Sequence, residues 1–329
     1  MADQPTPAAN GSRREQRPPH PKRYNVRYPQ RDQKDVPQDD EWCELIHDGA
    51  DGNNKHPAVE RIRFHDYESI YRHPGLYEQL FDDELKCASP YVMMRMLAKE
   101  LCQPRKKEEG YQMPTMRPRI IHGIPIIKAL DLGAGNGMMG EQLRKLRAHT
   151  VVGCDLLPAA REAALRDRPG VYDDYLVGDI TALLHDSGSS GGDQKDARCL
   201  RDAGFNVLTT VSALGFGDIP WAAFAAAISL IQKGGLIAFN LKDKIYAPDE
   251  HGSGGDDGGK GSTGAGFAVM ISQAVRGGHL EILAQHRYRH RLSVTGEPLY
   301  YYGIVAVKHG DMPMEKEVHG GGPGDPGNT

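Results

Sequence analysis

The sequence predicts an α/β protein in which strands and helices alternate around a parallel, doubly wound sheet. Three observations predict this fold. Short apolar segments alternate with segments of helical periodicity from residue 125 to 241. A glycine-rich turn, 131–137, separates the first of these strands from the first helix. Two long strand-like runs, 280–292 and 299–307, then follow each other across the turn-forming residues 293–298, so we expect the sheet to end in an antiparallel hairpin.

The N-terminal 40 residues are expected to be a disordered basic arm. The first 31 residues contain six prolines and seven Lys or Arg against two acids, without apolar periodicity. Such a segment buries too little surface to offset its ordering entropy. A solvated tail is favoured over an arm that contacts nucleic acid or an acidic partner. The Gly-rich segment 249–266 and the segment 309–329 are expected to be a flexible loop and a disordered tail.

Residues 41–124 are expected to form a cap segment and helices that precede the sheet. Two short alternating stretches at its start flank a turn and predict a small hairpin or a docking strand. Ser89 and Pro90 are residue types of an N-cap and a first helical position. Apolar residues then repeat at helical spacing as far as Leu101, which predicts a helix.

The core domain is expected to span 125–308. Its apolar segments are short and bounded by turn residues, as in strands, and the segments between them have helical periodicity. The predicted strands are 125–132, 150–156, 175–178, 205–211 and 236–241, and the predicted helices are 138–147, 158–168 and 221–232.

The composition argues against several classes of protein. A net charge of −4 gives no overall case for binding nucleic acid. The five cysteines are odd in number and contain no C-x-x-C pair, which argues against a disulfide framework or structural zinc and favours a cytoplasmic protein. The longest apolar run, 222–231, is too short to span a bilayer. No histidine has a metal-ligand spacing, so we assign no metal.

The strongest functional signal is the turn Asp131-Leu-Gly-Ala-Gly-Asn-Gly137, which lies directly between a strand and a helix. Open α/β sheets bind ligands at the carboxyl ends of their strands. Glycines there let a ligand approach the backbone, and the start of the helix offers free N–H groups. The predicted ligand-binding residues of the turn are Asp131, Gly133, Ala134, Gly135, Asn136 and Gly137.

Acidic residues at the strand ends distinguish between possible ligands. The turn also fits the dinucleotide pattern G-x-G-x-x-G, but Asp131 would repel a pyrophosphate. S-adenosylmethionine carries a sulfonium and an ammonium group instead of phosphates. Asp155 ends the second strand and can accept hydrogen bonds from ribose hydroxyls, whereas Asp179 follows the third strand and can accept from an adenine amino group. Leu156 and Ile180, which follow these acids, complete the predicted cofactor site; a helix cap is the alternative role for each Asp.

The turn, Asp155, Asp179 and the closing hairpin together resemble class I S-adenosylmethionine-dependent methyltransferases. More narrowly, 211–217, 234–240 and 73–77 are similar to bacterial relatives of the Williams–Beuren-region methyltransferase-like proteins. The resemblance covers residues 65–308. It implies a Rossmann-like, seven-stranded sheet, an N-terminal helical cover over the cofactor, and an acceptor that enters above the carboxyl ends of the strands.

The entry segment 67–81 contains three tyrosines whose rings can cover the sulfonium of S-adenosylmethionine. Tyr71 is expected to be the nearest to the cofactor, and packing of the helices onto the sheet is the alternative. Ser212, Asn240 and Asp243 end two predicted strands near the expected methyl group and are candidates for catalysis. A general base is needed only if the acceptor must lose a proton. Ser212 could instead cap its strand, and Asp243 could pair with a lysine.

The expected function is methyl transfer from S-adenosylmethionine to an unidentified acceptor, with a small molecule favoured. Three alternatives stay open from the sequence. A protein or RNA methyltransferase would use the basic arm for docking, and a non-catalytic regulator would bind S-adenosylmethionine with the same residues. An NAD-dependent oxidoreductase is the third alternative, and Asp131 and the terminal hairpin argue against it.

Overall fold

The computed structural model describes residues 24–47, 58–102, 120–121, 124–185, 200–214, 219–246 and 263–312. Much of the three segments expected to be disordered or flexible lies outside these residues, namely 1–23 of the arm, 249–262 of the Gly-rich loop and 313–329 of the tail. The expectations for those residues stay predictions.

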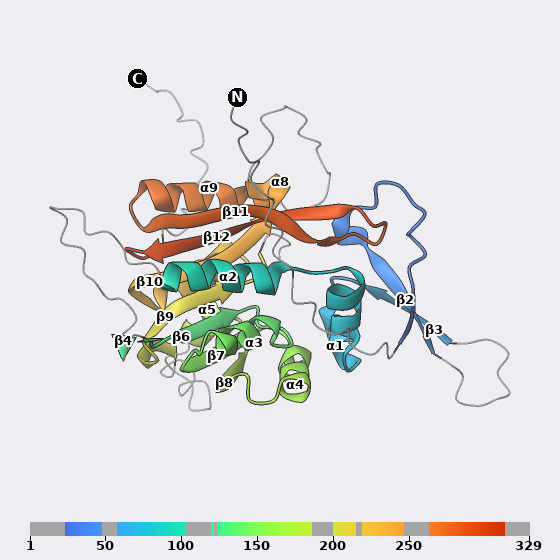
Figure 1. The fold of residues 1–329 in the computed structure, drawn as a ribbon, viewed down its shortest axis with the longest axis horizontal. Helices are drawn as coiled ribbons and strands as arrows, with labels where there is room; N and C mark the ends of the chain where they lie inside the picture. The colour runs from blue at the N-terminus through green and yellow to red at the C-terminus, as the bar shows by residue number, and fades with distance from the viewer. Residues whose placement is uncertain are drawn as a thin grey trace, which may run out of the picture.

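A seven-stranded sheet forms the centre of the protein, in the order β11-β12-β10-β9-β6-β7-β8 (Figure 1). Its strands are β6 (Lys128–Leu132), β7 (Thr150–Asp155), β8 (Asp174–Val177), β9 (Phe205–Thr210), β10 (Ile231–Lys242), β11 (Leu280–Leu292) and β12 (Pro298–Lys308). Strands β6 to β10 pair in parallel, and β12 runs antiparallel to both of its neighbours. The sheet confirms the predicted doubly wound, Rossmann-like architecture with a closing hairpin.

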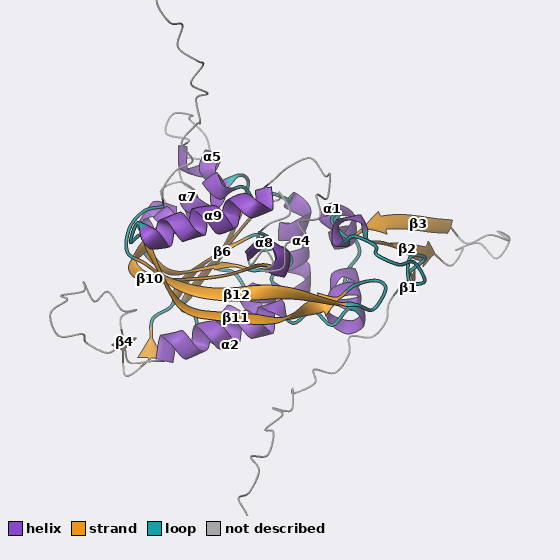
Figure 2. Cartoon of the chain, turned by 90° about the horizontal axis from the view of Figure 1, so that it is seen from above, coloured by secondary structure: helices purple, strands orange, loops and turns teal. Residues whose placement is uncertain are grey.

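Helices cover both faces of this sheet (Figure 2). One face carries α2 (Ser89–Cys102), α3 (Met138–Lys145) and α4 (Pro158–Asp167), and the other carries α5 (Ile180–His185), α7 (Trp221–Ser229) and α9 (Thr263–Arg276). A short helix, α8 (Asp243–Tyr246), follows β10. Each face has its own apolar core, since successive residues of a strand point to opposite sides.

Three predicted boundaries in the core domain were wrong. Strand β10 begins at Ile231 instead of residue 236, because α7 ends at Ser229 and not at 232. Strand β6 begins at Lys128 instead of residue 125, because β5 (Ile124–Pro125) pairs with β4 (Ile120–Ile121) in a separate two-stranded ladder. Helix α9 begins inside the predicted Gly-rich loop, at Thr263. Its buried residues Phe267, Met270, Ile271 and Ala274 have helical spacing and pack into the same core as α7.

The N-terminal cover is a small unit with a core of its own, and Figure 1 shows it beside the carboxyl ends of the central strands. It contains β1 (Asn25–Arg27), β2 (Trp42–His47) and β3 (Ala58–Arg63), followed by α1 (Tyr67–Arg72) and the π-helix η2 (Glu78–Glu84). The predicted hairpin and the helices over the site are therefore confirmed.

The described part of the predicted disordered arm, 24–40, is instead ordered. Strand β1 pairs antiparallel with β2, and the short 3-10 helix η1 (Gln38–Asp40) follows it. Gln38 donates a 3.0 Å hydrogen bond from its side chain to the Tyr301 hydroxyl of β12. The prediction failed because the alternating Tyr24, Val26 and Tyr28 pack against the cover core, a short pattern that the surrounding prolines and charges obscure.

A buried ion pair joins the cover to the C-terminal hairpin. The Glu41 carboxylate accepts a hydrogen bond from the Arg291 guanidinium and another, at 2.7 Å, from the backbone N–H of Val294. The Glu41 side chain is fully buried and that of Arg291 is 4% exposed. Because a buried charge without its partner is strongly unfavourable, each of these residues requires the other.

We predict that Glu41→Ala lowers the free energy of unfolding by about 3–5 kcal/mol, because it leaves the Arg291 charge buried and unpaired. Urea unfolding of the purified variant measures this loss. Glu68→Ala is the matched control, because Glu68 pairs with Arg72 across one turn of α1 and both side chains are exposed. That change should cost about 0.5 kcal/mol or less. Equal losses in the two variants would contradict a special role for the buried pair.

Candidate functional site

A cavity of about 300 Å³ lies at the carboxyl ends of β6, β7, β8 and β9. The chain passes from β6 to β7 and β8 on one side and then returns to β9 and β10 on the other. This reversal of strand order is the usual position of a ligand site in an open α/β sheet. Ten of the residues singled out from the sequence line the cavity, and they are Tyr71, Gly133, Ala134, Gly135, Asn136, Asp155, Leu156, Asp179, Ile180 and Ser212.

The glycine turn adopts a backbone conformation that side chains rarely allow. Gly133, Gly135 and Gly137 have φ values of 69°, 52° and 90°. A Cβ atom added to Gly135 would lie 2.6 Å from the Tyr71 hydroxyl oxygen. The turn therefore needs glycine both for its conformation and for the close approach of α1, and Gly137 supports the turn without lining the cavity.

Asp155 supports the turn and also faces the cavity. Its Oδ2 accepts a 2.8 Å hydrogen bond from the backbone N–H of Gly135, and its Oδ1 accepts one at 3.0 Å from Leu157. Burial raises the pKa of this carboxyl group, and these backbone donors oppose the rise. The contact with Leu157, directly before α4, agrees with the capping alternative that the sequence left open, and the cofactor role of Asp155 stays a prediction.

Asp131 lies beneath the turn and not in the cavity. Its carboxylate accepts hydrogen bonds from Thr209 Oγ1 at 2.6 Å and from the Tyr172 hydroxyl at 2.7 Å, and the residue is only 1% exposed. Burial raises its pKa to about 6, although both hydrogen bonds oppose the rise. Asp131 therefore does not line the cavity, because β9 and the segment before β8 supply the hydroxyl groups that bond to its carboxylate; its role toward a cationic cofactor stays a prediction.

Asp179 lies at the edge of the cavity and starts α5. Its Oδ1 accepts hydrogen bonds from the backbone N–H and the hydroxyl of Thr181, both at 2.8 Å. This is the helix-capping arrangement that the sequence left open as the alternative. Asp179 caps the helix and also lines the cavity beside Ile180, so its role toward a ligand stays a prediction.

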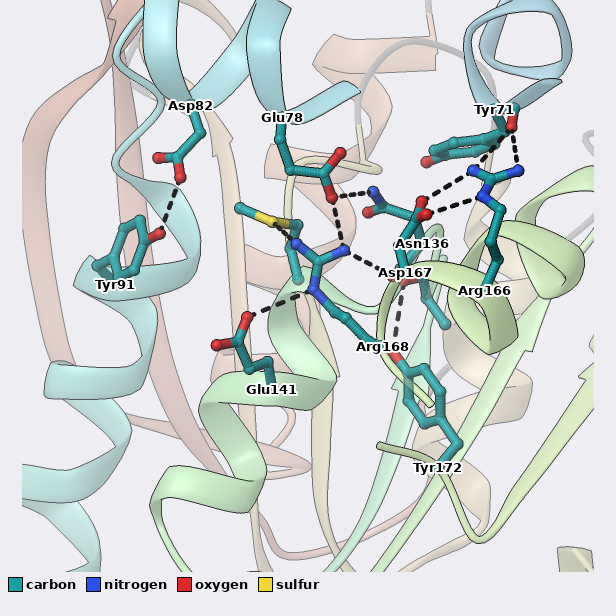
Figure 3. A network of polar contacts seen from close by, with 12 residues as sticks. Tyr71, Glu78, Asp82, Tyr91, Asn136, Glu141, Arg166, Asp167, Arg168 and Tyr172 are labelled. Carbon is teal, nitrogen blue, oxygen red and sulfur yellow. Dashed lines mark hydrogen bonds and ion pairs between the residues drawn. The ribbon is translucent and has the colours of Figure 1, made fainter. Parts of the chain in front are cut away.

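A buried ionic network connects the turn to the cover (Figure 3). Arg168 donates hydrogen bonds from Nη1 to Glu78 Oε1 at 2.7 Å and to the carbonyl of Asn136 at 3.0 Å. The Asn136 side chain donates to the same Glu78 oxygen at 2.8 Å. Arg168 also contacts Glu141 of α3 at 3.3 Å. Sequence reasoning missed Glu78, Glu141 and Arg168, because only the position of Glu78 beside the buried apolar residues of η2 hints at a charge that requires a partner.

Four aromatic rings form one wall of the cavity. Tyr67 stacks on Tyr71 with a centroid separation of 6.1 Å, Tyr77 lies 5.5 Å from Tyr71, and Phe81 lies 4.7 Å from Tyr77. All four belong to the segment 67–81 and line the cavity. Tyr71 is 6% exposed, and its carbonyl accepts two hydrogen bonds from Arg166 of α4, which Figure 3 also shows. The entry segment therefore covers the site as expected.

The three catalytic candidates have different surroundings. Ser212 lines the cavity with φ at 62°, and its buried Oγ has no hydrogen-bond partner among the described residues. Asn240 is fully buried behind it and accepts a 2.7 Å hydrogen bond from the Ser212 backbone N–H. Asp243 pairs with Arg287 at 2.7 Å and does not line the cavity. The expectation that Asn240 and Asp243 face the acceptor was wrong. The Asn240 side chain bonds to the Ser212 backbone, the Asp243 carboxylate pairs with Arg287, and neither residue lines the cavity.

Comparison with known proteins gives only distant likenesses. No family model and no curated protein matches the chain. Among solved structures, an N-methyltransferase from Bradyrhizobium japonicum is 11% identical with a TM-score of 0.40 and covers 74% of this chain and 97% of its own. An O-methyltransferase from Streptomyces achromogenes is 12% identical with a TM-score of 0.42, covering 74% of this chain and 90% of its own.

A third structure, an S-adenosylmethionine-dependent methyltransferase from Clostridium acetobutylicum, is 12% identical with a TM-score of 0.38 and covers 71% of this chain and 97% of its own. All three belong to the class that the sequence resembles, and the narrower likeness to the Williams–Beuren-region proteins is not shown. Since all three TM-scores are below 0.5, the function is argued from the site itself.

The described part of the chain contains neither a candidate metal site nor a candidate membrane-spanning helix. No group of three or more His, Cys, Asp or Glu there is arranged to hold a metal ion. The described helices likewise include none with the length and apolar character that crossing a membrane requires.

We predict that Gly135→Ala destabilises the protein and that Tyr71→Phe partly relieves the loss. The positive φ alone costs about 1–2 kcal/mol for alanine, and the Tyr71 hydroxyl adds a clash with the new Cβ atom. In a double-mutant cycle measured by urea unfolding, Gly135→Ala should therefore cost about 1 kcal/mol less in the Tyr71→Phe background than in the wild type. Strictly additive effects would mean that the two groups do not meet.

We also predict a pH dependence of stability that arises from Asp131. Its carboxyl has a pKa near 3.8 in the unfolded chain and about 6 in the folded protein. Its contribution is therefore present below about pH 4 and is lost as the pH rises through about 6, a change of about 3 kcal/mol. Unfolding measured across this range should show the loss in the wild type and not in Asp131→Asn. Parallel pH profiles would contradict the assignment.

Proposed function

We propose that the protein is an S-adenosylmethionine-dependent methyltransferase that acts on a small molecule. The observation that carries the proposal is the charge of the cavity beside the glycine turn. Its described lining includes the carboxylates of Asp155 and Asp179 but no lysine or arginine. A pyrophosphate would meet two acids without a counterion, whereas a cofactor that has hydroxyl, amino and cationic groups suits this surface.

The residues of the cavity fit the parts of S-adenosylmethionine. Asp155 would accept from the ribose hydroxyls, and Asp179 would accept from the adenine amino group, with Leu156 and Ile180 beside the base. Gly133 and Gly135 line the cavity with backbone alone, because a Cβ atom on either would collide with Ala213 or with the Tyr71 hydroxyl. The aromatic wall would cover the sulfonium with electron-rich rings, a contact worth about 0.5–2 kcal/mol.

Bound S-adenosylmethionine supplies a methyl group on a positively charged sulfur, which a nucleophile can displace. The chain contributes position and exclusion of water, and these effects can supply most of the rate of such a reaction. Asp131 contributes indirectly by fixing β6 against β9 through Thr209. Of the residues proposed for catalysis, Ser212 is the one that lines the cavity, so a contact with the acceptor is assigned to it.

Three alternatives differ from this proposal in the acceptor, in the cofactor, or in whether the methyl group is transferred. The cover lies over the cavity and forms part of its wall, which favours a small acceptor over a protein or RNA chain. A regulator would bind S-adenosylmethionine without transferring its methyl group, and labelled cofactor followed into fractionated cell extract separates these cases. An NAD-dependent oxidoreductase would bind NAD in preference to S-adenosylhomocysteine.

We predict that S-adenosylhomocysteine binds with micromolar affinity and NAD does not, as measured by calorimetry. Asp155→Ala should weaken binding about tenfold or more, because a hydrogen bond to a charged group contributes about 1.5–3 kcal/mol. It should also destabilise the unbound protein, since two backbone N–H groups lose their acceptor.

Asp173→Ala is the matched control for this measurement. Asp173 also accepts a backbone N–H hydrogen bond, at 2.8 Å from Val151, but it does not line the cavity. Its loss should leave the affinity for S-adenosylhomocysteine unchanged. Tight binding of NAD without binding of S-adenosylhomocysteine would overturn the proposed function.

A further inference from the structure

The two ends of the cavity differ in charge. Both lining carboxylates, Asp155 and Asp179, belong to the end beside β7 and β8. Ser212 follows β9 on the other side of the reversal in strand order, and the Asn240 side chain links it to Ser89 at the start of α2. We define the acceptor chamber as Ser212 together with the lining residues His65, Phe81, Cys87 and Pro90 of the N-terminal segment. None of the described residues of this chamber is an acid, a lysine or an arginine. The wall of the chamber therefore offers no counterion to a charged compound.

The titratable groups of the chamber are uncharged at neutral pH. Burial lowers the pKa of His65 to about 4, and the nearby charges of Lys242 and Arg291 act in the same direction while Asp39 opposes them. Burial also raises the pKa of Cys87 to about 11. The imidazole is thus neutral and the thiol protonated.

Lys242 and Arg291, whose charges act on His65, are held by other partners. Lys242 contacts Asp39 at 2.7 Å, and Arg291 pairs with the buried Glu41. Neither Lys242 nor Arg291 lines the cavity. An anionic acceptor would have to lose its hydration without gaining an ion pair from the protein, which is strongly unfavourable in a buried site.

A buried network holds Ser212 in its unusual conformation. The Asn240 side chain accepts from the Ser212 backbone N–H and donates to Ser89 Oγ at 3.0 Å and to the Tyr288 hydroxyl at 2.8 Å. Ser89 Oγ lies 2.7 Å from His290 Nδ1. These contacts occupy the polar atoms behind the chamber wall, whereas the buried Ser212 hydroxyl has no partner among the described residues, although Ser212 itself lines the chamber.

We infer that the acceptor chamber binds the methyl acceptor as an uncharged small molecule, with a planar aromatic body and a polar group that bonds to Ser212 Oγ. This inference rests on the proposed function. Phe81 and Pro90 supply flat apolar surfaces for stacking. A buried hydroxyl without a partner favours a ligand that provides one, since an unmade hydrogen bond in a buried site is unfavourable.

The test uses four simple aromatic probes with and without saturating S-adenosylhomocysteine, and ligand-observed NMR titrations measure their affinities. Phenol and toluene are uncharged, benzoate is an anion, and benzylamine is a cation at neutral pH. We expect phenol to bind about tenfold or more tightly than either charged probe. A charged probe that binds as tightly as phenol would overturn the inference, as would a failure of all probes to bind while S-adenosylhomocysteine binds.

Ser212→Gly tests the assigned hydrogen bond. Glycine accepts the φ of 62° at this position, so the variant removes the hydroxyl and keeps the backbone. Phenol should lose about threefold or more in affinity while toluene, which has no hydroxyl, should be unaffected. Equal losses for the two probes, or none, would overturn the role of Ser212. Ser229→Ala is the matched control, because Ser229 bonds to the Ala226 carbonyl on an exposed part of α7.

The two failures can be told apart. Unchanged probe preferences without any binding of S-adenosylhomocysteine would overturn the proposed function and support the chamber as a site for uncharged aromatic compounds. Binding of S-adenosylhomocysteine without the probe preferences would overturn the chamber's assignment alone.

Discussion

The backbone conformation of the turn 133–137 is the constraint on which the site depends. Three glycines of this turn have positive φ. Because glycine adopts positive and negative φ about equally, the glycines alone do not hold the turn in this conformation. Its peptide groups are consequently held from several sides. The Asp155 carboxylate accepts a hydrogen bond from the Gly135 N–H, and the Gly135 carbonyl accepts one from the Tyr175 hydroxyl at 2.7 Å. Arg168 donates a hydrogen bond to the next carbonyl, that of Asn136. The turn is thus fixed before any ligand arrives.

The same constraint couples the N-terminal cover to the sheet. Glu78 of η2 accepts from both Arg168 and Asn136, so the cover and the turn share one buried carboxylate. At the other end of the cover, Glu41 joins it to the C-terminal hairpin through Arg291. These two buried connections place the aromatic wall over the carboxyl ends of the strands. The cavity consequently belongs to two units that lie far apart in the sequence.

Local patterns predicted those parts of the structure that depend on local chemistry. The strands, the glycine turn and the closing hairpin were all evident, because periodicity and turn residues express short-range preferences. The role of Asp131 was not predictable in this way. Its partners, Tyr172 and Thr209, lie 41 and 78 residues along the chain and meet it only in the folded sheet. Helix α9 was missed because glycines at its start obscured an otherwise regular apolar spacing.

The sequence could not separate the three catalytic candidates, for a related reason. Ser212, Asn240 and Asp243 all follow or end strands, and sequence position alone cannot separate a group that faces a cavity from one that supports it. Side-chain partners make the separation. Asn240 has all of its hydrogen-bonding groups engaged by Ser89, Tyr288 and the Ser212 backbone, as a buried amide requires.

A buried polar group without a hydrogen-bond partner is unfavourable, so a single unpartnered hydroxyl in an otherwise complete network indicates a group that a ligand can bind. In the network behind the cavity, that atom is Ser212 Oγ, and the residue that carries it has a strained backbone. The surrounding hydrogen bonds stabilise this strain without using the hydroxyl itself. A residue that supports the site has its polar atoms bonded to the protein, whereas a residue that contacts a ligand keeps one unbonded. This criterion favours Ser212 over Asp243 and Asn240.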